Sequence, residues 1–136
     1  MADAANPPGE IREKVAVVAT EPYLGNPRAG CFNLRQMEKE VRSLEEFYRR
    51  AFAGVAKALK KGGRLVAVWP VFRFRGDFFY LEILKDFERM GFRKESFLPE
   101  GVEKEGLGLK LTKRGSVVFY RPGQTVSREI FIFSKS

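Results

Sequence analysis

The chain has 136 residues, of which 44% are hydrophobic and 31% are charged, a composition typical of one soluble folded domain with a hydrophobic core. Lys and Arg (25) outnumber Asp and Glu (17), and the net charge of +8 favours a polyanionic partner, although a solvated basic surface would carry the same charge. One cysteine and no histidine exclude a disulfide framework, a zinc cluster and a Ser-His or Cys-His catalytic pair made by this chain alone.

The sequence predicts neither a membrane span nor a signal peptide. No apolar stretch approaches the roughly 20 residues that a span needs, and the first 14 residues lack a signal-peptide hydrophobic region. We therefore expect a cytoplasmic protein that does not enter a membrane. Residues 1–13 contain Asn, Pro and Gly with little periodicity, and they predict a flexible lead-in to one domain over residues 14–136.

The first predicted strand covers residues 15–19, an apolar run that leads into a loop containing Pro22 and Gly25. In an open α/β sheet, ligands bind at the carboxyl ends of the strands. The loop over residues 20–25, Thr-Glu-Pro-Tyr-Leu-Gly, is therefore the candidate chemical site. The alternative is an ordinary strand-ending turn in which Tyr23 packs in the core.

A stripe of apolar residues at steps of three and four follows the loop. It covers residues 37–59 and predicts a helix of about six turns that faces the core. A capping box at residues 33–36 or at residues 43–46 gives two alternative starts for this helix. Gly62 and Gly63 are expected to end it.

The second predicted strand covers residues 64–69 and is almost continuously apolar, as in a parallel-sheet strand buried on both faces. Strand, helix and strand at this spacing predict one right-handed βαβ unit. Pro70 is expected to end the strand. Beyond it, Arg73 and Arg75 alternate with Phe residues and, with Arg28, are candidates for phosphate contacts, although solvated charge explains them equally well.

The rest of the chain predicts a second helix followed by strands. The helix covers residues 78–90, with Asp77 as its N-cap and Gly91 after its last turn. A short strand at residues 92–98 and a charged, Gly-rich insertion at residues 99–108 come next.

Two clear strands, at residues 115–120 and 128–133, flank an Arg-Pro-Gly-Gln turn and predict an antiparallel hairpin. Ile and Phe alternate along the second of these strands, so both of its faces are apolar and it is expected to lie inside the sheet. Arg128 is assigned to the hairpin rather than to a substrate site.

This order of elements resembles the second half of a class I S-adenosylmethionine-dependent methyltransferase, where the last strand inserts antiparallel between its hairpin partner and the preceding parallel strand. Within that superfamily, three segments and Arg128-Glu129-Ile130 resemble the tRNA guanosine N2-methyltransferases whose complete members carry an N-terminal THUMP RNA-binding domain. The segments are Thr20-Glu21-Pro22-Tyr23-Leu24-Gly25, Lys61-Gly62-Gly63-Arg64 and Tyr120-Arg121-Pro122-Gly123-Gln124. The resemblance covers about residues 14–134.

The resemblance implies an α/β fold that is the second half of a Rossmann-like class I methyltransferase sheet, with two parallel strands, a crossover helix and a C-terminal antiparallel hairpin. The N-terminal cofactor-binding half is missing, because no strand is followed by the Gly-rich turn and acidic residue of that half. We therefore expect S-adenosyl-L-methionine to need a complementary chain that carries this half. Residues 15–19 would then be an unprotected sheet edge, through which the isolated chain is expected to form a homodimer, aggregate or be only marginally stable.

The resemblance further implies methyl transfer to guanine N2 of tRNA, or of another RNA, without a metal. The implied catalytic residues, which accept hydrogen bonds from the target amine or stack on its base, are Thr20, Glu21, Pro22 and Tyr23. The implied substrate-binding residues are Leu24, Gly25, Arg28, Arg73 and Arg75. The family's motif usually has Asp or Asn and then Pro-Pro, whereas Thr20 and Glu21 occupy the first two positions here.

Two other functions fit the same residues. One is a non-catalytic RNA-binding or interaction module that keeps the fold and the basic charge. The other is methylation of a different amine, such as adenine N6 in DNA or RNA or a glutamine amide, because Pro-Tyr loops serve all of these targets.

Overall fold

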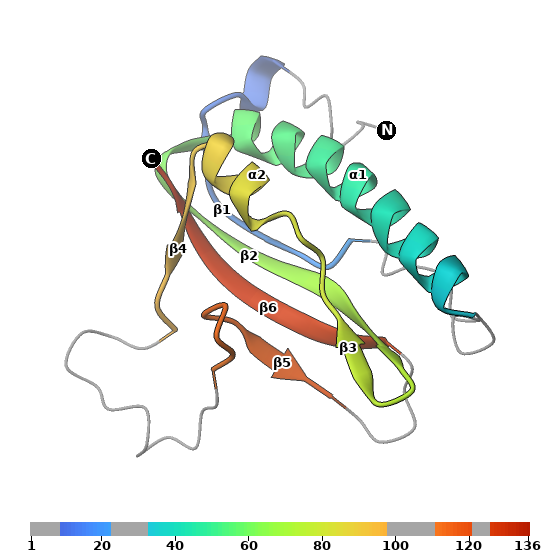
Figure 1. The fold of residues 1–136 in the computed structure, drawn as a ribbon. Helices are drawn as coiled ribbons and strands as arrows, with labels where there is room; N and C mark the ends of the chain where they lie inside the picture. Colours follow the sequence, from blue (N-terminus) through green and yellow to red (C-terminus); the bar gives the residue numbers. More distant parts are fainter. Residues whose placement is uncertain (1–8, 23–32, 98–110, 121–125) are drawn as a thin grey trace.

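In the computed structural model of the chain, which describes residues 9–22, 33–97, 111–120 and 126–136, a mixed sheet carries helices on one of its faces (Figure 1). In chain order, the elements are η1 (Gly9–Ile11), β1 (Val15–Thr20), α1 (Leu34–Ala58), β2 (Leu59–Phe74), β3 (Asp77–Phe79), α2 (Leu84–Arg89), β4 (Phe92–Glu95), β5 (Val117–Phe119) and β6 (Val126–Lys135). The insertion predicted at residues 99–108 and the turn at residues 121–124 lie outside the described residues.

The sheet has the strand order β1-β2-β6-β4, with β3 paired to β2 and β5 paired to β6. Strands β1 and β2 are parallel and α1 connects them, as predicted. Strand β6 is antiparallel to β2 on one side and to β4 and β5 on the other, so the predicted hairpin and the interior position of the last strand are confirmed. Among the described residues, β1 forms one edge of the sheet.

Helix α1 begins at the first of its two predicted capping boxes. Asn33 Oδ1 accepts the backbone N–H of Gln36, and Gln36 Oε1 accepts the backbone N–H of Asn33. The prediction that Gly62 and Gly63 end the helix is wrong, since it ends at Ala58. The backbone becomes extended at the C-cap residue Leu59, and the Lys135 ammonium group donates hydrogen bonds to the carbonyls of Ala56 and Leu59.

The two glycines lie instead in an irregular part of the β1–β2 ladder, where β1 advances from Val15 to Val17 while β2 advances from Leu59 to Arg64. A Cβ atom on Gly63 would lie 2.8 Å from the carbonyl oxygen of Lys60 and 3.1 Å from that of Ala16. The close approach of two backbone segments therefore requires glycine at this position.

Gly63→Ala is expected to lower the free energy of unfolding by about 1–3 kcal/mol, because the added methyl group overlaps backbone atoms that cannot move independently. Gly9→Ala is the matched control, since a Cβ atom there meets no heavy atom within 4 Å. Urea denaturation of the two variants measures the difference. Equal stability of both would contradict the close approach at Gly63.

Strand β2 does not end at Pro70, as the sequence predicted, but continues to Phe74. Pro70 pairs with Arg128 of β6. On the other side of β2, pairing with β1 ends at Ala67 and pairing with β3 begins at Phe72. Proline, which has no backbone N–H, is tolerated at this position because, among the described residues, this stretch of β2 is paired with a strand on one side only.

The predicted helix over residues 78–90 is also wrong in its first half, where β3 forms a hairpin with β2. Arg75 and Gly76 form the turn with φ angles of 51° and 83°, the positive pair that a two-residue type I′ turn requires. Helix α2 forms only from Leu84 to Arg89, and Gly91 follows it as predicted.

The core lies between the helices and one face of the sheet. Trp69 is fully buried at its centre, with the rings of Phe87, Phe131 and Phe133 around it. The other face of the sheet is less covered, so the expectation that residues 64–69 are buried on both faces is wrong. On that face the partly exposed apolar side chains include Val66, Val68, Ile130 and Ile132.

Candidate functional site

The candidate site begins at the carboxyl end of β1. Thr20 is the last residue of this strand and is paired with Ala67 of β2, and Glu21 and Pro22 follow it. The remaining predicted residues of the loop, Tyr23, Leu24, Gly25 and Arg28, lie outside the described residues.

An ion pair fixes Glu21. Arg128 Nε donates to Glu21 Oε1 at 2.6 Å, although the two residues are 107 positions apart. They meet because β6 is antiparallel to β2, which brings the first residues of β6 to the end of the sheet where β1 finishes. Both side chains remain partly exposed, so the pair contributes about 0–1 kcal/mol to stability, and its main effect is on the position of the Glu21 carboxylate.

Tyr48 of α1 lies fully buried on the helix side of this site. Burial, and secondarily the negative charge of Glu21, raise the pKa of the Tyr48 phenol above its ordinary value. The phenol therefore stays neutral at physiological pH. Tyr48 lies within the apolar stripe that predicts this helix, and no local signal in the sequence connects it with Glu21.

The two arginines predicted beyond the second strand lie on aromatic rings. The guanidinium carbon of Arg73 is 4.2 Å from the ring centroid of Tyr120 and 5.4 Å from that of Phe78. Arg75, in the β2–β3 turn, lies 5.1 Å from the ring centroid of Phe74. These are cation–π distances, so the side chains are held in place without an acidic partner among these contacts.

Glu129 of β6 is a fully buried carboxylate between the core and residues 111–116. Ser116 Oγ donates to Glu129 Oε2 at 2.6 Å, and Arg114 Nε lies 3.5 Å from the same oxygen. Arg114 also donates to the carbonyl of Leu81 at 2.5 Å. The network thereby ties residues 111–116 to β6 and to the segment before α2.

Burial raises the pKa of Glu129 above its ordinary value, against the opposing effects of Ser116 and Arg114. As the pH rises from the ordinary carboxyl range to this raised pKa, the folded state holds a proton that the unfolded chain has lost, so stability falls. Glu129→Gln is expected to remove this fall. Urea denaturation across that pH range measures it, with Glu88→Gln as an exposed control. Parallel curves for wild type and Glu129→Gln would contradict the assignment.

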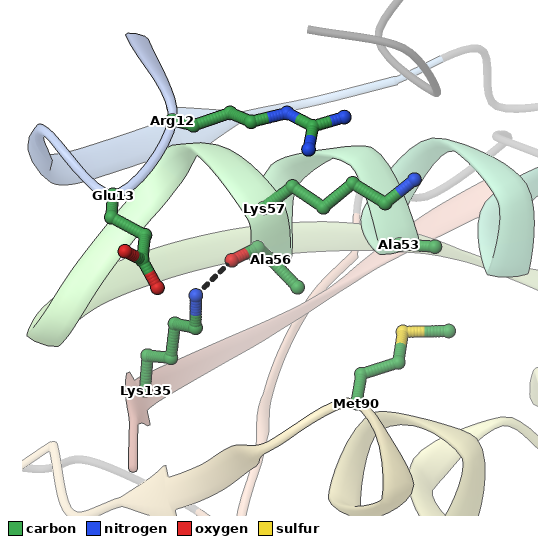
Figure 2. Close-up of a pocket in the computed structure, with 7 residues that line it drawn as sticks. All are labelled: Arg12, Glu13, Ala53, Ala56, Lys57, Met90 and Lys135. Carbon is green, nitrogen blue, oxygen red and sulfur yellow. Dashed lines mark hydrogen bonds between the residues drawn. The ribbon is translucent and has the colours of Figure 1, made fainter. Parts of the chain in front are cut away.

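A cavity of about 560 Å³ lies at the opposite end of β1 (Figure 2). It is lined by cationic Arg12, Lys57 and Lys135, together with Glu13. Figure 2 shows the Lys135 ammonium directed at the carbonyl of Ala56, to which it is hydrogen-bonded. The cavity is therefore next to the end of α1, and away from the carboxyl ends of the parallel strands.

Two negative findings apply to the described residues. They contain no group of three or more His, Cys, Asp or Glu side chains that could hold a metal ion. None of the helices that they form is long and apolar enough to cross a membrane.

Neither a family model nor a curated protein matches the sequence. A solved protein from Thermus thermophilus, named as a DNA modification methylase, matches the structure with a TM-score of 0.51 and 18% identity, over 98% of this chain and 52% of that one. The chain shares the fold of about half of that protein. A second crystal structure of the same methylase, in complex with S-adenosyl-L-methionine, gives a TM-score of 0.44 and 19% identity, over 91% and 46% of the two chains.

PvuII DNA methyltransferase, named as cytosine-N4-specific, gives a TM-score of 0.48 and 18% identity, over 92% of this chain and 44% of that one. This chain thus spans about half the length of the solved structures that it matches.

Proposed function

We propose that this chain is the catalytic-loop half of an S-adenosylmethionine-dependent methyltransferase that acts on an exocyclic amine of a nucleic-acid base. The observation that carries the proposal is the fixed Glu21 carboxylate at the carboxyl end of β1, held by Arg128 beside buried Tyr48. The fold shared with half of the Thermus methylase, and the sequence resemblance of the loop, support it.

For this methyl transfer, the main role of the protein would be to position the reacting groups. The lone pair of an exocyclic amine is delocalised into the base, so the site must accept the amine hydrogens and let the nitrogen turn towards the methyl group. Glu21 and nearby backbone carbonyls are the proposed acceptors, and Pro22 has no N–H to compete as a donor. Tyr23 is proposed to stack on the base. Most of the acceleration would come from holding amine and methyl group in line.

The proposed substrate is tRNA, with guanine N2 as its methylated amine. This choice follows the motifs at residues 20–25, 61–64 and 120–124, and a net charge of +8 suits an RNA. The name of the Thermus protein describes DNA modification, so an amine of a DNA base, such as adenine N6, is the second candidate.

S-adenosyl-L-methionine, the proposed cofactor, would supply an electrophilic methyl group. Residues Thr20 to Pro22 can line the methyl end of its site, but the described residues contain no Gly-rich turn between a strand and a helix for the rest of it. We therefore propose that the cofactor-binding half lies outside these 136 residues. The edge position of β1 and the partly exposed second face of the sheet support this arrangement.

Calorimetric titration with S-adenosyl-L-methionine tests the proposal, on this chain alone and after addition of the polypeptide that carries the cofactor-binding half. Binding is expected only for the completed protein. Absence of binding in both cases would contradict the enzymatic function. Tight tRNA binding without methylation in any complex would favour the non-catalytic RNA-binding module.

Strand β1 is expected to mediate self-association of the isolated chain, because its outer edge has no partner strand among the described residues and Val17 is 62% exposed. Val17→Lys should shift the chain towards a monomer. Sedimentation velocity over a concentration series measures this. A wild-type chain that stays monomeric at all concentrations would count against the exposed edge.

A further inference from the structure

Three aromatic rings and an arginine lie together around the β2–β3 hairpin, in a group that we call the aromatic–arginine cluster: Arg73, Phe78, Tyr80 and Tyr120. The Arg73 guanidinium lies over both Tyr120 and Phe78, and the Phe78 and Tyr80 ring centroids are 6.3 Å apart. Phe78 is 44% exposed and Tyr120 is 41% exposed. Phe78 of the hairpin and Tyr120 after β5 are thus partly open to solvent next to the Arg73 guanidinium.

The geometry of this cluster fits flat ligands that carry negative charge. Arg73 Nε is buried and has no hydrogen-bond partner among the described residues, so a ligand would meet the terminal nitrogens of this guanidinium rather than Nε. Arg75 adds a second cation at the tip of the hairpin. Exposed aromatic rings beside arginines can bind unpaired nucleotides, because every base can stack on a ring and the arginines can contact the phosphates.

A groove of about 430 Å³ adjoins the cluster, between the first half of α1 and residues 78–82. Phe78 and Tyr80 form part of its apolar lining, and Glu38 and Glu82 add exposed carboxylates. Carboxylates accept hydrogen bonds from the exocyclic amines of cytosine and adenine, which uracil and thymine lack. The groove can therefore distinguish bases that stacking alone would treat alike.

We propose that the aromatic–arginine cluster and this groove bind unpaired bases of a nucleic-acid strand, with a preference for bases that carry an exocyclic amine. The cluster stacks on the bases, Arg73 and Arg75 contact phosphates, and the groove carboxylates accept the amine hydrogens. The inference rests on the proposed function in taking a nucleic acid as the substrate, but it needs neither cofactor nor methyl transfer.

Fluorescence anisotropy with labelled single-stranded 12-mers tests this inference on the chain itself, without S-adenosyl-L-methionine. The probes are oligo(dC), oligo(dT), oligo(rC) and oligo(rU), and a DNA duplex. Both cytosine strands are expected to bind more tightly than the thymine and uracil strands, and the duplex is expected to bind most weakly. The comparison of dC with rC identifies the sugar that the site prefers.

Phe78→Ala and Tyr120→Ala should each weaken cytosine-strand binding by about 5-fold to 150-fold, the range measured for loss of one stacked base. Phe47→Ala is the matched control, because Phe47 is 39% exposed and lies on α1, outside the cluster and the groove. Arg73→Lys keeps the charge but loses the planar stack, so it should also weaken binding. Thermal melts confirm that the variants remain folded.

Folded Phe78→Ala and Tyr120→Ala variants that bind as tightly as wild type would overturn the inference. Equal affinity for cytosine and thymine strands would overturn the role of the groove. The binding assay contains no cofactor, so its result does not depend on whether the protein transfers a methyl group. Conversely, absence of strand binding would overturn this inference but would not affect the calorimetric test of cofactor binding.

Discussion

Replacing Trp69 with alanine is expected to lower the free energy of unfolding by about 3–5 kcal/mol. Trp69 is fully buried on β2, and its ring centroid lies 4.5 Å from that of Phe131 and 4.9 Å from that of Phe87. Alanine would leave a cavity that these rings cannot close without moving β6 or α2. Since domains of this size are stable by only about 5–15 kcal/mol, the loss is a large part of the total.

Urea denaturation followed by far-UV circular dichroism measures this loss. Phe47→Ala, which removes a partly exposed ring from α1, is the control and should cost about 1 kcal/mol or less. If Trp69→Ala cost no more than the control, Trp69 would not be at the centre of the core.

Glu21→Ala is expected to lower kcat for methyl transfer by about 100-fold in the completed enzyme, while affinity for S-adenosyl-L-methionine stays unchanged. Glu21 is favoured over Thr20 as the acceptor because its carboxylate is held by a hydrogen bond from Arg128 Nε to Glu21 Oε1, with a length of 2.6 Å. Thr20→Ala should therefore have an effect below about 10-fold. Transfer of a tritiated methyl group to RNA measures both variants, with the exposed Glu88→Ala as control.

Arg128 is a positioning residue in this account, since it acts through Glu21. Arg128→Ala should lower kcat, and Arg128→Lys should restore part of it because a cation then returns to the carboxylate. If Thr20→Ala abolished transfer while Glu21→Ala did not, the roles of the two side chains would be reversed.

The sequence predicted helix α1 well because two independent signals agree there. The apolar stripe places Met37, Leu44, Tyr48 and Phe52 on one face, and all four are buried. The capping box at Asn33 is one of the two starts that the sequence predicted, and the helix begins there. The parallel pairing of β1 and β2 followed from the same unit, since a strand, a helix and a strand of these lengths have one favoured arrangement.

The second helix was predicted too long because the apolar residues before Leu84 have helical spacing but are part of the β2–β3 hairpin and the segment after it. Phe87 has the spacing expected of a helix and does lie in α2, whereas Phe78 pairs with Arg73 in the hairpin. In the turn between Arg73 and Phe78, Arg75 has a φ of 51°. The only local indication of this turn in the sequence is the neighbouring Gly76.

The candidate site could be predicted from the sequence only in part. Local reasoning identified the end of β1 with Thr20, Glu21 and Pro22, because a strand followed by a Pro-containing loop is a local pattern. It missed Arg128 and Tyr48, because the contact of Glu21 with Arg128 depends on the register of β6 against β2. Such long-range register is set by the whole sheet, and no local pattern at either residue specifies that the two side chains pair.

The most direct test incubates the completed protein with tritiated S-adenosyl-L-methionine and unmodified tRNA or DNA, and identifies the labelled nucleoside by mass spectrometry. We expect label on an exocyclic amine, with guanine N2 of tRNA as the proposed position, and its loss in Glu21→Ala. A completed protein that binds the cofactor but labels no nucleic acid, or labels a ring carbon or a ribose oxygen, would contradict the account.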